Sequence, residues 1–380
     1  MQKEIKIFFD EISEFYNSNK SLVVFRKPDD TNITAYIQND DALYSLNSFE
    51  KQGFVFVPFN KSEKPIIFPV EKCKKLTSEI SDKVDLEITK NNSTFKVVSD
   101  KNSEENHIQL VQKGINFINN SAAKKVVLSR KETLEFDKFE VINTLKKMLN
   151  SYKNAFVYLW VHPRVGLWMG ATPERLLSVS DNKFETMALA GTQLFKKSTN
   201  VIWKEKEQQE QQFVTDYIVE NIKNSIDKIT VSDAYTVKAG NLLHIRTDIL
   251  GELKSSSSLG NLIDSLHPTP AVCGLPKEKA IKFILKNEGY DRAYYTGYLG
   301  ELNIDNSTSL FVNLRCMQLN NSTASIYIGG GITKDSISKN EWEETVSKAE
   351  VMKKVLENKK VLSSKFFIRN YILMITVRIN

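Results

Sequence analysis

The stretch TPERLLSVSDNKFETMALAGT, residues 172–192, sets the local fold from which the rest of the chain can be interpreted. Thr172-Pro173 predicts a turn, because proline fixes its own φ and moves the preceding residue out of the α region. The apolar run at 176–179 predicts a strand, and Asp181-Asn182 supplies residues that reverse a chain. The run at 184–189 then predicts the returning strand of a hairpin.

This hairpin places one carboxylate, Glu174, where it begins and the small residues Ala190, Gly191 and Thr192 where it ends. A glycine has no Cβ, so another backbone or a ligand can approach it closely. Taken alone, the stretch is also compatible with an ordinary surface hairpin whose Glu174 is solvated. The choice between these two interpretations depends on the rest of the chain.

The composition is that of a globular protein rather than a nucleic-acid binder. The chain has 380 residues, enough for two domains or for one large α+β domain. Its 52 lysines and arginines against 46 aspartates and glutamates give a net charge of +6 without a basic block. So diffuse a charge argues against nucleic acid and mildly favours an anionic small substrate. The three cysteines, Cys73, Cys273 and Cys316, follow no pairing pattern and predict reduced, intracellular thiols.

The N-terminus, MQKEIKIFFDEISEFY, carries apolar residues at helical spacing with acidic residues between them. This pattern predicts an amphipathic helix and lacks the uninterrupted apolar stretch of a signal peptide. No apolar run reaches transmembrane length, so we expect a soluble cytoplasmic protein that does not bind membranes. The polar stretch 99–107 is the most linker-like part of the chain. Strands are expected near 22–26, 33–38, 54–58 and 66–69.

The segment 204–226 predicts a long helix with a very polar beginning. Glu210 lies four residues before Val214 and seven before Tyr217, so it extends the inward apolar stripe of this helix. Glu205 and Glu207 are expected on the solvated side. The apolar stripe consists of Phe213, Val214, Tyr217, Ile218 and Ile222.

The remaining elements are expected as helices over 108–118, 139–149 and 277–287 and as strands near 125–130, 155–162, 229–237, 242–253, 295–302, 309–319 and 324–328. The last of these strands runs into Gly329-Gly330-Gly331, which lacks the spacing of a dinucleotide fold or a P-loop. We expect these glycines to offer three exposed backbone N–H groups to an anion.

A final long helix is expected to begin with a capping box, Ser338-x-x-Glu341, which gives Glu341 a structural role. Glu344 and Lys348 are four residues apart, so a carboxylate and an ammonium share the face on which this helix packs.

Eight motifs follow one another along the chain: KVVLSR at 125–130, ATPERLL at 171–177, LAGT at 189–192, Glu210 in its polar helix, HPTPAVCG at 267–274, LRC at 314–316, GGGI at 329–332 and EWEET at 341–345. In this order and spacing they resemble the chorismate-utilising enzymes, the family with the fold of anthranilate synthase component I. The resemblance covers roughly 104–357, the C-terminal two-thirds of the chain.

The resemblance implies a single large α+β domain. In this fold two antiparallel sheets face each other, outer helices cover them, and the site opens at one end of the sandwich. It divides the chain into a variable N-terminal part of the sandwich at 1–100, a chorismate-binding catalytic core at 101–358 and an atypical C-terminal extension at 359–380.

Within the family the chain looks most like the isochorismate synthases, which serve menaquinone or catechol-siderophore pathways. Lys125 is typical of members that use water as the nucleophile, whereas ammonia-using members usually have glutamine there. Ala190 stands where aminodeoxychorismate synthases often carry a lysine nucleophile. The resemblance therefore implies Mg²⁺-dependent conversion of chorismate to isochorismate without an amidotransferase subunit.

The residues that match the family motifs receive roles from this chemistry. Lys125 is expected to be the base, with Lys124 as its rival, because strand alternation alone does not decide which lysine points inward. Glu174 is expected to be the acid, with a pKa raised by a poorly solvated site. Glu210 and Glu344 are expected to hold Mg²⁺, with Glu341 as a possible outer member. Substrate contacts are expected from Ala190, Gly191, Thr192, His244, Arg315, Tyr327, Gly329, Gly330, Gly331 and Lys348.

Several alternatives stay open at this point. A salicylate synthase would carry the same lysine and glutamates and continue to pyruvate elimination. The protein could also be an ammonia-using anthranilate or aminodeoxychorismate synthase component, or a catalytically silent chorismate-binding module. His244 could be an ordinary core histidine whose hydrogen bonds are satisfied within the protein. The sequence does not decide the pathway or the oligomeric state.

Overall fold

The hairpin predicted at 172–192 forms as two antiparallel strands, β10 (Arg175–Ser180) and β11 (Lys183–Leu194). Asp181 and Asn182 connect them with φ values of 49° and 64°. This left-handed region suits Asp and Asn, whose short polar side chains tolerate it. The computed structural model describes residues 2–80, 85–89, 95–98, 102–196, 198–239, 242–320 and 322–356. The predicted extension at 359–380 lies outside these residues.

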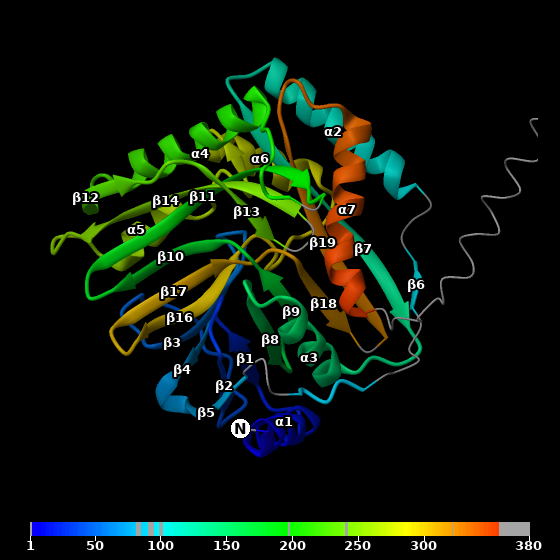
Figure 1. Ribbon diagram of the computed structural model, residues 1–380, viewed down its shortest axis with the longest axis vertical. Coiled ribbons are helices and arrows are strands. Elements are labelled where there is room, and N and C mark those ends of the chain that lie inside the picture. Colours follow the sequence, from blue (N-terminus) through cyan, green and yellow to red (C-terminus); the bar gives the residue numbers. More distant parts are fainter. Residues whose placement is uncertain are drawn as a thin grey trace, which may run out of the picture.

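Two antiparallel sheets form the centre of the described chain (Figure 1). The first sheet follows the order β15 (Gly274–Leu275), β7 (Lys125–Phe136), β19 (Thr323–Ile332), β18 (Cys316–Asn320), β9 (Gly166–Thr172), β8 (Phe156–His162), β1 (Leu22–Arg26), β2 (Asn32–Gln38) and β5 (Cys73–Glu79), with β6 (Phe95–Val97) beside β7. The second follows the order β12 (Ile226–Val231), β14 (Leu242–Leu253), β11, β10, β17 (Ser307–Val312), β16 (Tyr298–Ile304), β3 (Gly53–Val57) and β4 (Ile66–Pro69), with β13 (Tyr235–Ala239) beside β14.

The two sheets face each other across an aromatic core, because alternate residues of a strand point to opposite faces. In β1, Val23 and Phe25 belong to this inner core, while Leu22 and Val24 pack under the outer helices. Phe56, Trp160 and Trp168 fill the space between the sheets and are fully buried. Central strands such as β1 and β8 are therefore buried on both faces, as their near-continuous apolar runs require.

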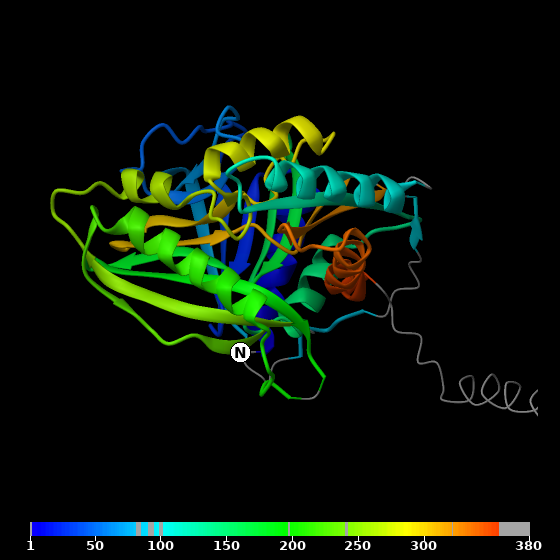
Figure 2. The same cartoon turned by 90° about the horizontal axis from the view of Figure 1, so that it is seen from above.

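Helices cover the outside of the sandwich (Figure 2). Three of them, α1 (Gln2–Asn17), α3 (Val141–Ser151) and α7 (Ser338–Leu356), share a core with the first sheet. Two others, α4 (Glu205–Ile222) and α5 (Leu259–Leu266), pack on the second sheet. The last two, α2 (Ser103–Asn119) and α6 (Lys277–Asn287), cover the end of the first sheet around β7. The predicted α+β class with two facing antiparallel sheets and outer helices is confirmed.

Two neighbouring segments carry the chain from one sheet to the other, and we call them the strand crossing. Pro173 and Glu174 connect β9 of the first sheet to β10 of the second, and residues 313–315 connect β17 of the second to β18 of the first. The predicted single strand at 309–319 is therefore wrong. Arg315 has a φ of 47°, outside the strand region, so the strand ends there and a new one begins.

Other expected elements also differ in extent. Residues 103–107, within the stretch expected to be a linker, form the beginning of α2, where acidic side chains favour a helix N-terminus. The helix expected over 204–226 ends at Ile222, and the strand expected at 229–237 consists of two strands, β12 and β13. Sequence analysis missed α5 and several short strands, including β9.

Candidate active site

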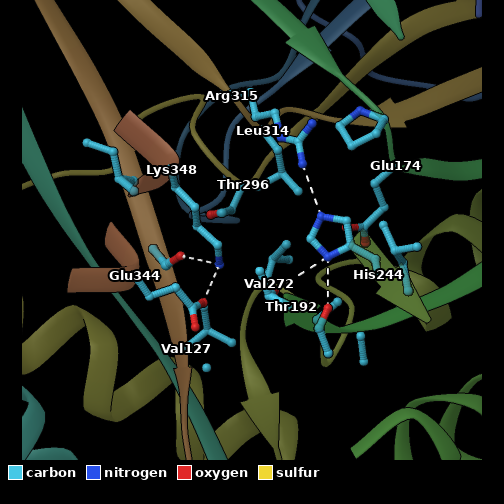
Figure 3. A pocket seen from close by; sticks show the side chains of 18 of the residues that line it. Val127, Glu174, Thr192, His244, Val272, Thr296, Leu314, Arg315, Glu344 and Lys348 are labelled. Atoms are coloured by element: carbon cyan, nitrogen blue, oxygen red, sulfur yellow. Dashed lines mark hydrogen bonds and ion pairs between the residues drawn. The ribbon is translucent and has the colours of Figure 1, made fainter. Parts of the chain in front are cut away.

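A cavity of about 190 Å³ opens where the strand crossing meets α4 and α7. Every residue predicted to take part in the site lines this cavity except Lys124 and Gly330. Figure 3 shows Glu174, His244 and Arg315 on one side, with Glu344 and Lys348 across from them. The fold therefore brings predicted residues from seven separate motifs together around one cavity.

The strand crossing fixes two of these side chains through backbone hydrogen bonds. The carbonyl of Glu174 accepts from the amide of Val312 at 2.9 Å, and the carbonyl of Arg315 accepts from the amide of Ala171 at 3.1 Å. The Thr172 hydroxyl also donates to the carbonyl of Val312 at 2.6 Å. Each crossing segment therefore holds its neighbour, and Glu174 and Arg315 need no loop of their own to reach the cavity.

Glu174 has the environment of a proton donor. Its side chain is 5% exposed, and burial raises its pKa to about 7, against the opposing charges of Lys125 and Arg315. The hydroxyl of Thr269, from the proline-rich loop before β15, donates to its Oε1 at 3.4 Å. The upward shift predicted from the sequence is thus found, and the surface-hairpin interpretation of Glu174 is wrong.

The structure shows which of the two candidate lysines points into the cavity. Lys125, the first residue of β7, is 6% exposed, and its Nζ lies 2.6 Å from Glu210 Oε1 inside the cavity. Lys124 is exposed and lies outside, with its Nζ 5.0 Å from the ring centroid of Phe213. Phe213 was expected on the buried stripe of its helix, but its side chain is 43% exposed.

A buried ion pair fixes the cavity wall behind Lys125. Arg292 and Glu288 approach to 2.5 Å with both side chains 2% exposed. Arg292 donates to the backbone carbonyls of Val127 and Val272, and Glu288 accepts from the amide and hydroxyl of Ser129. A charge pair so satisfied by hydrogen bonds ties β7 to the loop before β15.

Four carboxylates line the side of the cavity opposite the strand crossing. Glu210 and Glu344, the predicted metal ligands, come from α4 and α7. Glu207 was expected in solvent, but it lies one helical turn before Glu210 and lines the same cavity. Its Oε2 is buried and has no hydrogen-bond partner among the described residues. The spacing of three residues between Glu207 and Glu210 could have predicted that both side chains lie on the same face of the helix.

Glu341 also lines the cavity, and its predicted capping box is wrong. The amide of Glu341 donates to the carbonyl of Ile337 at 3.1 Å, and the Ser338 hydroxyl turns instead toward Gln112 at 3.5 Å. Ser338 is thus the first helical residue rather than the cap, which leaves the Glu341 side chain buried at 8% exposure facing the site.

The three glycines lie within β19 and pair with β7. Successive N–H groups of a strand point to opposite edges, so the expected row of three exposed donors does not form. Gly329 and Gly331 line the cavity. Gly330 lies on the other face of the strand, where a Cβ would be 3.6 Å from Glu341 Oε2 and 3.8 Å from Glu344 Oε1.

These glycines leave room between the carboxylates. A Cβ at Gly331 would lie 3.4 Å from Glu210 Oε1 and 2.9 Å from Lys125 Cε. A side chain at this position would displace both groups. The absence of side chains is therefore what lets α4 and α7 present their carboxylates to one space.

Lys348 connects α7 to β19. Its Nζ lies 2.7 Å from Glu344 Oε1 and donates to the carbonyl of Gly329 at 3.1 Å. The lysine therefore faces the cavity beside the predicted metal carboxylate, as the shared helix face required.

His244 lies between the hairpin and the strand crossing. Its Nε2 accepts from Arg315 Nη2 at 3.1 Å, so its Nδ1 carries the hydrogen and donates to the carbonyl of Gly191 at 2.8 Å. Burial, together with the charge of Arg315, lowers the His244 pKa to about 3, which keeps the ring neutral. Burial also lowers the pKa of Arg315, to about 10.

The end of the hairpin meets His244 at an irregularity of β11. The pairing between β11 and β14 shifts between Ala190 and Gln193, and Gly191 has a φ of 68°. Such a conformation favours glycine, and the Cβ of Glu207 would lie 3.3 Å from a Cβ at this position. Ala190, Gly191 and Thr192 line the cavity, as predicted.

Tyr327 belongs to an aromatic stack on the cavity floor. Its ring is parallel to those of Trp168 and Tyr295, with centroids at 5.3 and 5.5 Å. Its hydroxyl donates to Gln318 Oε1 at 3.1 Å. The stack gives the cavity one flat apolar wall beside its charged groups.

The donor set fits Mg²⁺, the ion that the sequence resemblance implies. Within the described chain no cluster of three or more His, Cys, Asp or Glu side chains is close enough to hold a metal by itself. Glu210 and Glu344 are each paired with a lysine. Mg²⁺ is usually held by one or two carboxylates together with waters and substrate oxygens, so this set suits it as part of a shell.

The comparisons with known proteins agree with this geometry. The model of the chorismate binding enzyme family matches residues 52–357. The isochorismate synthase MenF of Bacillus subtilis is 30% identical over 240 residues, 60% of this chain and 50% of that protein. The salicylate biosynthesis isochorismate synthase of Pseudomonas aeruginosa is 27% identical over 241 residues, 61% of this chain and 50% of that protein. The chain spans about half the length of these curated relatives.

Solved structures share the fold. MenF, the menaquinone-specific isochorismate synthase of Escherichia coli, has a TM-score of 0.74 at 19% identity, over 89% of each chain. Anthranilate synthase component I of Streptococcus pneumoniae has a TM-score of 0.66 at 18% identity, over 87% of this chain and 92% of that one. In the part of the chain that is described, no helix has the length and apolar character needed to cross a membrane. With the family model matching well over half its length, this chain belongs to the chorismate binding enzymes.

Proposed function

We propose that the protein is a Mg²⁺-dependent isochorismate synthase, which converts chorismate to isochorismate. The observation that carries the proposal is the pairing of a buried lysine with a buried, protonatable glutamate around one cavity. Lys125 and Glu174 both line it, and the Glu174 pKa of about 7 lies near neutrality. A reaction that adds water at one carbon and expels a hydroxyl at another requires such an acid and such a base.

The two groups have complementary roles. Lys125 takes a proton from water as the oxygen bonds to C2 of the ring. Glu174 gives its proton to the C4 hydroxyl, which leaves as water while the double bonds shift. One water is taken up and one released, so the conversion is an isomerisation. Burial of Glu174 keeps its proton available near pH 7.

The remaining groups bind and orient the substrate. Arg315 and Lys348 supply positive charge for the side-chain carboxylate, with a planar guanidinium suited to bidentate pairing. The neutral His244 is positioned to contact the C4 hydroxyl, and its hydrogen bond to Gly191 fixes its orientation. Tyr327 lies beside the same cavity wall.

Glu210 and Glu344 would hold Mg²⁺, with Glu207 and Glu341 available to orient its waters. When bound, the ion would supply the positive charge that draws electron density from the ring carboxylate. Lys125 supports water rather than ammonia as the nucleophile, and Ala190 leaves no enzyme-bound amine at that position. We therefore expect no amidotransferase subunit.

We infer that the isochorismate feeds menaquinone or catechol-siderophore biosynthesis. The three cysteines form no disulfide, which supports a reducing compartment such as the cytoplasm.

Incubation of the purified protein with chorismate and Mg²⁺, followed by separation of the products, tests the proposal. We expect isochorismate, formed reversibly and without ammonia or glutamine. Equal amounts of salicylate and pyruvate would identify a salicylate synthase instead. An aminated product in the presence of ammonia, with no isochorismate, would contradict the proposal.

A further inference from the structure

A second cavity, of about 450 Å³, lies against the same ion pair from another direction. It is enclosed by α2, α4, the segment before β7 and the segment after β19. Lys125 and Glu210 are the two residues that line both cavities. The other residues of the second cavity are Ile118, Asn119, Ala123, Lys124, Gln209, Phe213, Val214, Leu275, Thr333, Lys334 and Asp335.

The two residues that line both cavities form an ion pair. Lys125 Nζ and Glu210 Oε1 meet at 2.6 Å, and their side chains are 7% and 22% exposed. Lys125 therefore borders a space separate from the one lined by Glu174 and Arg315.

The second cavity reaches the protein surface. Asn119, Lys124 and Gln209 are exposed, and Phe213 is 43% exposed. The ammonium of Lys124 lies 5.0 Å from the Phe213 ring centroid, so a cation–aromatic contact holds it against one wall. Lys124 and Phe213 therefore both line the second cavity where it meets the surface.

We propose that the second cavity is the route by which the water nucleophile reaches Lys125 while chorismate occupies the first cavity. This inference rests on the proposed function. Under the proposed function chorismate occupies the first cavity beside Lys125 and Glu174, so the water consumed at C2 needs access that the substrate does not block. The water loses a proton to Lys125, its oxygen bonds to C2, and the C4 oxygen leaves with the proton of Glu174 on the other side.

The route predicts that Lys125 stays accessible to small reagents when substrate is bound. Reductive methylation with formaldehyde and a borane, followed by peptide mass spectrometry, measures this access, with the exposed Lys279 as internal standard. In the presence of Mg²⁺ and saturating chorismate we expect Lys125 to be methylated nearly as fast as without chorismate. Two variants fill the second cavity: Ala123→Leu, at a buried position, and Asn119→Trp, at an exposed position that folding tolerates.

Both filling variants should slow Lys125 methylation about tenfold in the presence of substrate and lower kcat about tenfold at unchanged KM. Ala234→Leu is the matched control, because Ala234 lines a different cavity that includes neither Lys125 nor Glu210. Protection of Lys125 by chorismate in the unaltered protein, or methylation unaffected by filling, would overturn the route. If the ion pair keeps Lys125 unreactive throughout, an unchanged kcat in both filling variants overturns it.

The methylation result does not depend on turnover. A protein that forms no isochorismate but keeps Lys125 accessible beside bound chorismate would contradict the proposed function and leave the second access in place. A protein that forms isochorismate at the normal rate with the second cavity filled would support the proposed function and contradict the second access.

Discussion

The two sides of the active-site cavity are built in different ways. On one side, the strand crossing places Glu174 and Arg315 through backbone hydrogen bonds between neighbouring chain segments. On the other, α4 and α7 present four glutamates whose positions depend on side-chain rotamers and on ion pairs with Lys125 and Lys348. Under the proposed function, the crossing provides a fixed geometry, and the helices provide charges that would rearrange when Mg²⁺ and chorismate bind.

The largest expected effect lies with the acid and the base. Lys125→Ala and Glu174→Ala should each lose about 10²–10⁴-fold in kcat with chorismate binding largely kept, because each removes a proton-transfer group. Steady-state kinetics and binding of chorismate to the variants measure both quantities. A variant that keeps normal kcat would remove that residue from its proposed role.

The metal carboxylates should respond differently from the acid and base. Glu210→Gln and Glu344→Gln should raise the Mg²⁺ concentration for half-maximal activity by about 100-fold, since a neutral amide is a poorer ligand for a hard cation. Titration of activity with Mg²⁺ measures the shift. Glu205→Gln, an exposed position on the same helix, is the matched control and should leave the titration unchanged.

Glu207 and Glu341 test which of the four glutamates on α4 and α7 bind the metal directly. Each faces the cavity without being one of the two assigned ligands, so Glu207→Gln and Glu341→Gln should shift the same Mg²⁺ titration by only about tenfold. A shift at Glu207 equal to that at Glu210 would mean that Glu207 is itself a ligand. No shift at all would return Glu207 to a purely structural role.

The pH dependence tests the fixed side of the cavity. Burial raises the Glu174 pKa to about 7, so the acid is protonated below this pH and loses its proton above it. The contribution of this acid to kcat of the forward reaction should therefore fall as pH rises through about 7, approaching tenfold per pH unit. The Glu174→Ala variant should lose this dependence, and a variant that keeps it would exclude Glu174 as the proton donor.

The smallest effect is expected at Lys124. Its side chain is exposed and lies over Phe213 outside the active-site cavity, so Lys124→Ala should keep kcat within about twofold. An inactive Lys124→Ala together with a normal Lys125→Ala would reverse the assignment of the base.

The sequence predicted the fixed side of the cavity better than the helical side. The hairpin, Lys125 and the burial of Glu174 followed from turn residues, apolar runs and the family motifs. The split at Arg315 did not, because a positive φ at an arginine has no sequence signature and the flanking run is uniformly β-prone.

On the helical side, the roles of Glu207 and Glu341 were misjudged for a physical reason. A glutamate near a helix N-terminus has a good local explanation, in solvent or in a cap, and only the tertiary packing shows that it faces a cavity. Thr269 was missed because nothing in a proline-rich loop indicates which hydroxyl will meet Glu174.

The strand crossing also has a mechanical consequence for the whole molecule. Two adjacent segments run in opposite directions from one sheet to the other and are hydrogen-bonded to each other as they pass. The sheets are therefore braced against shear, and they cannot part without breaking the same hydrogen bonds that hold the acid in place. We therefore expect any opening of the cavity to occur at α4 and α7 rather than at the strand crossing.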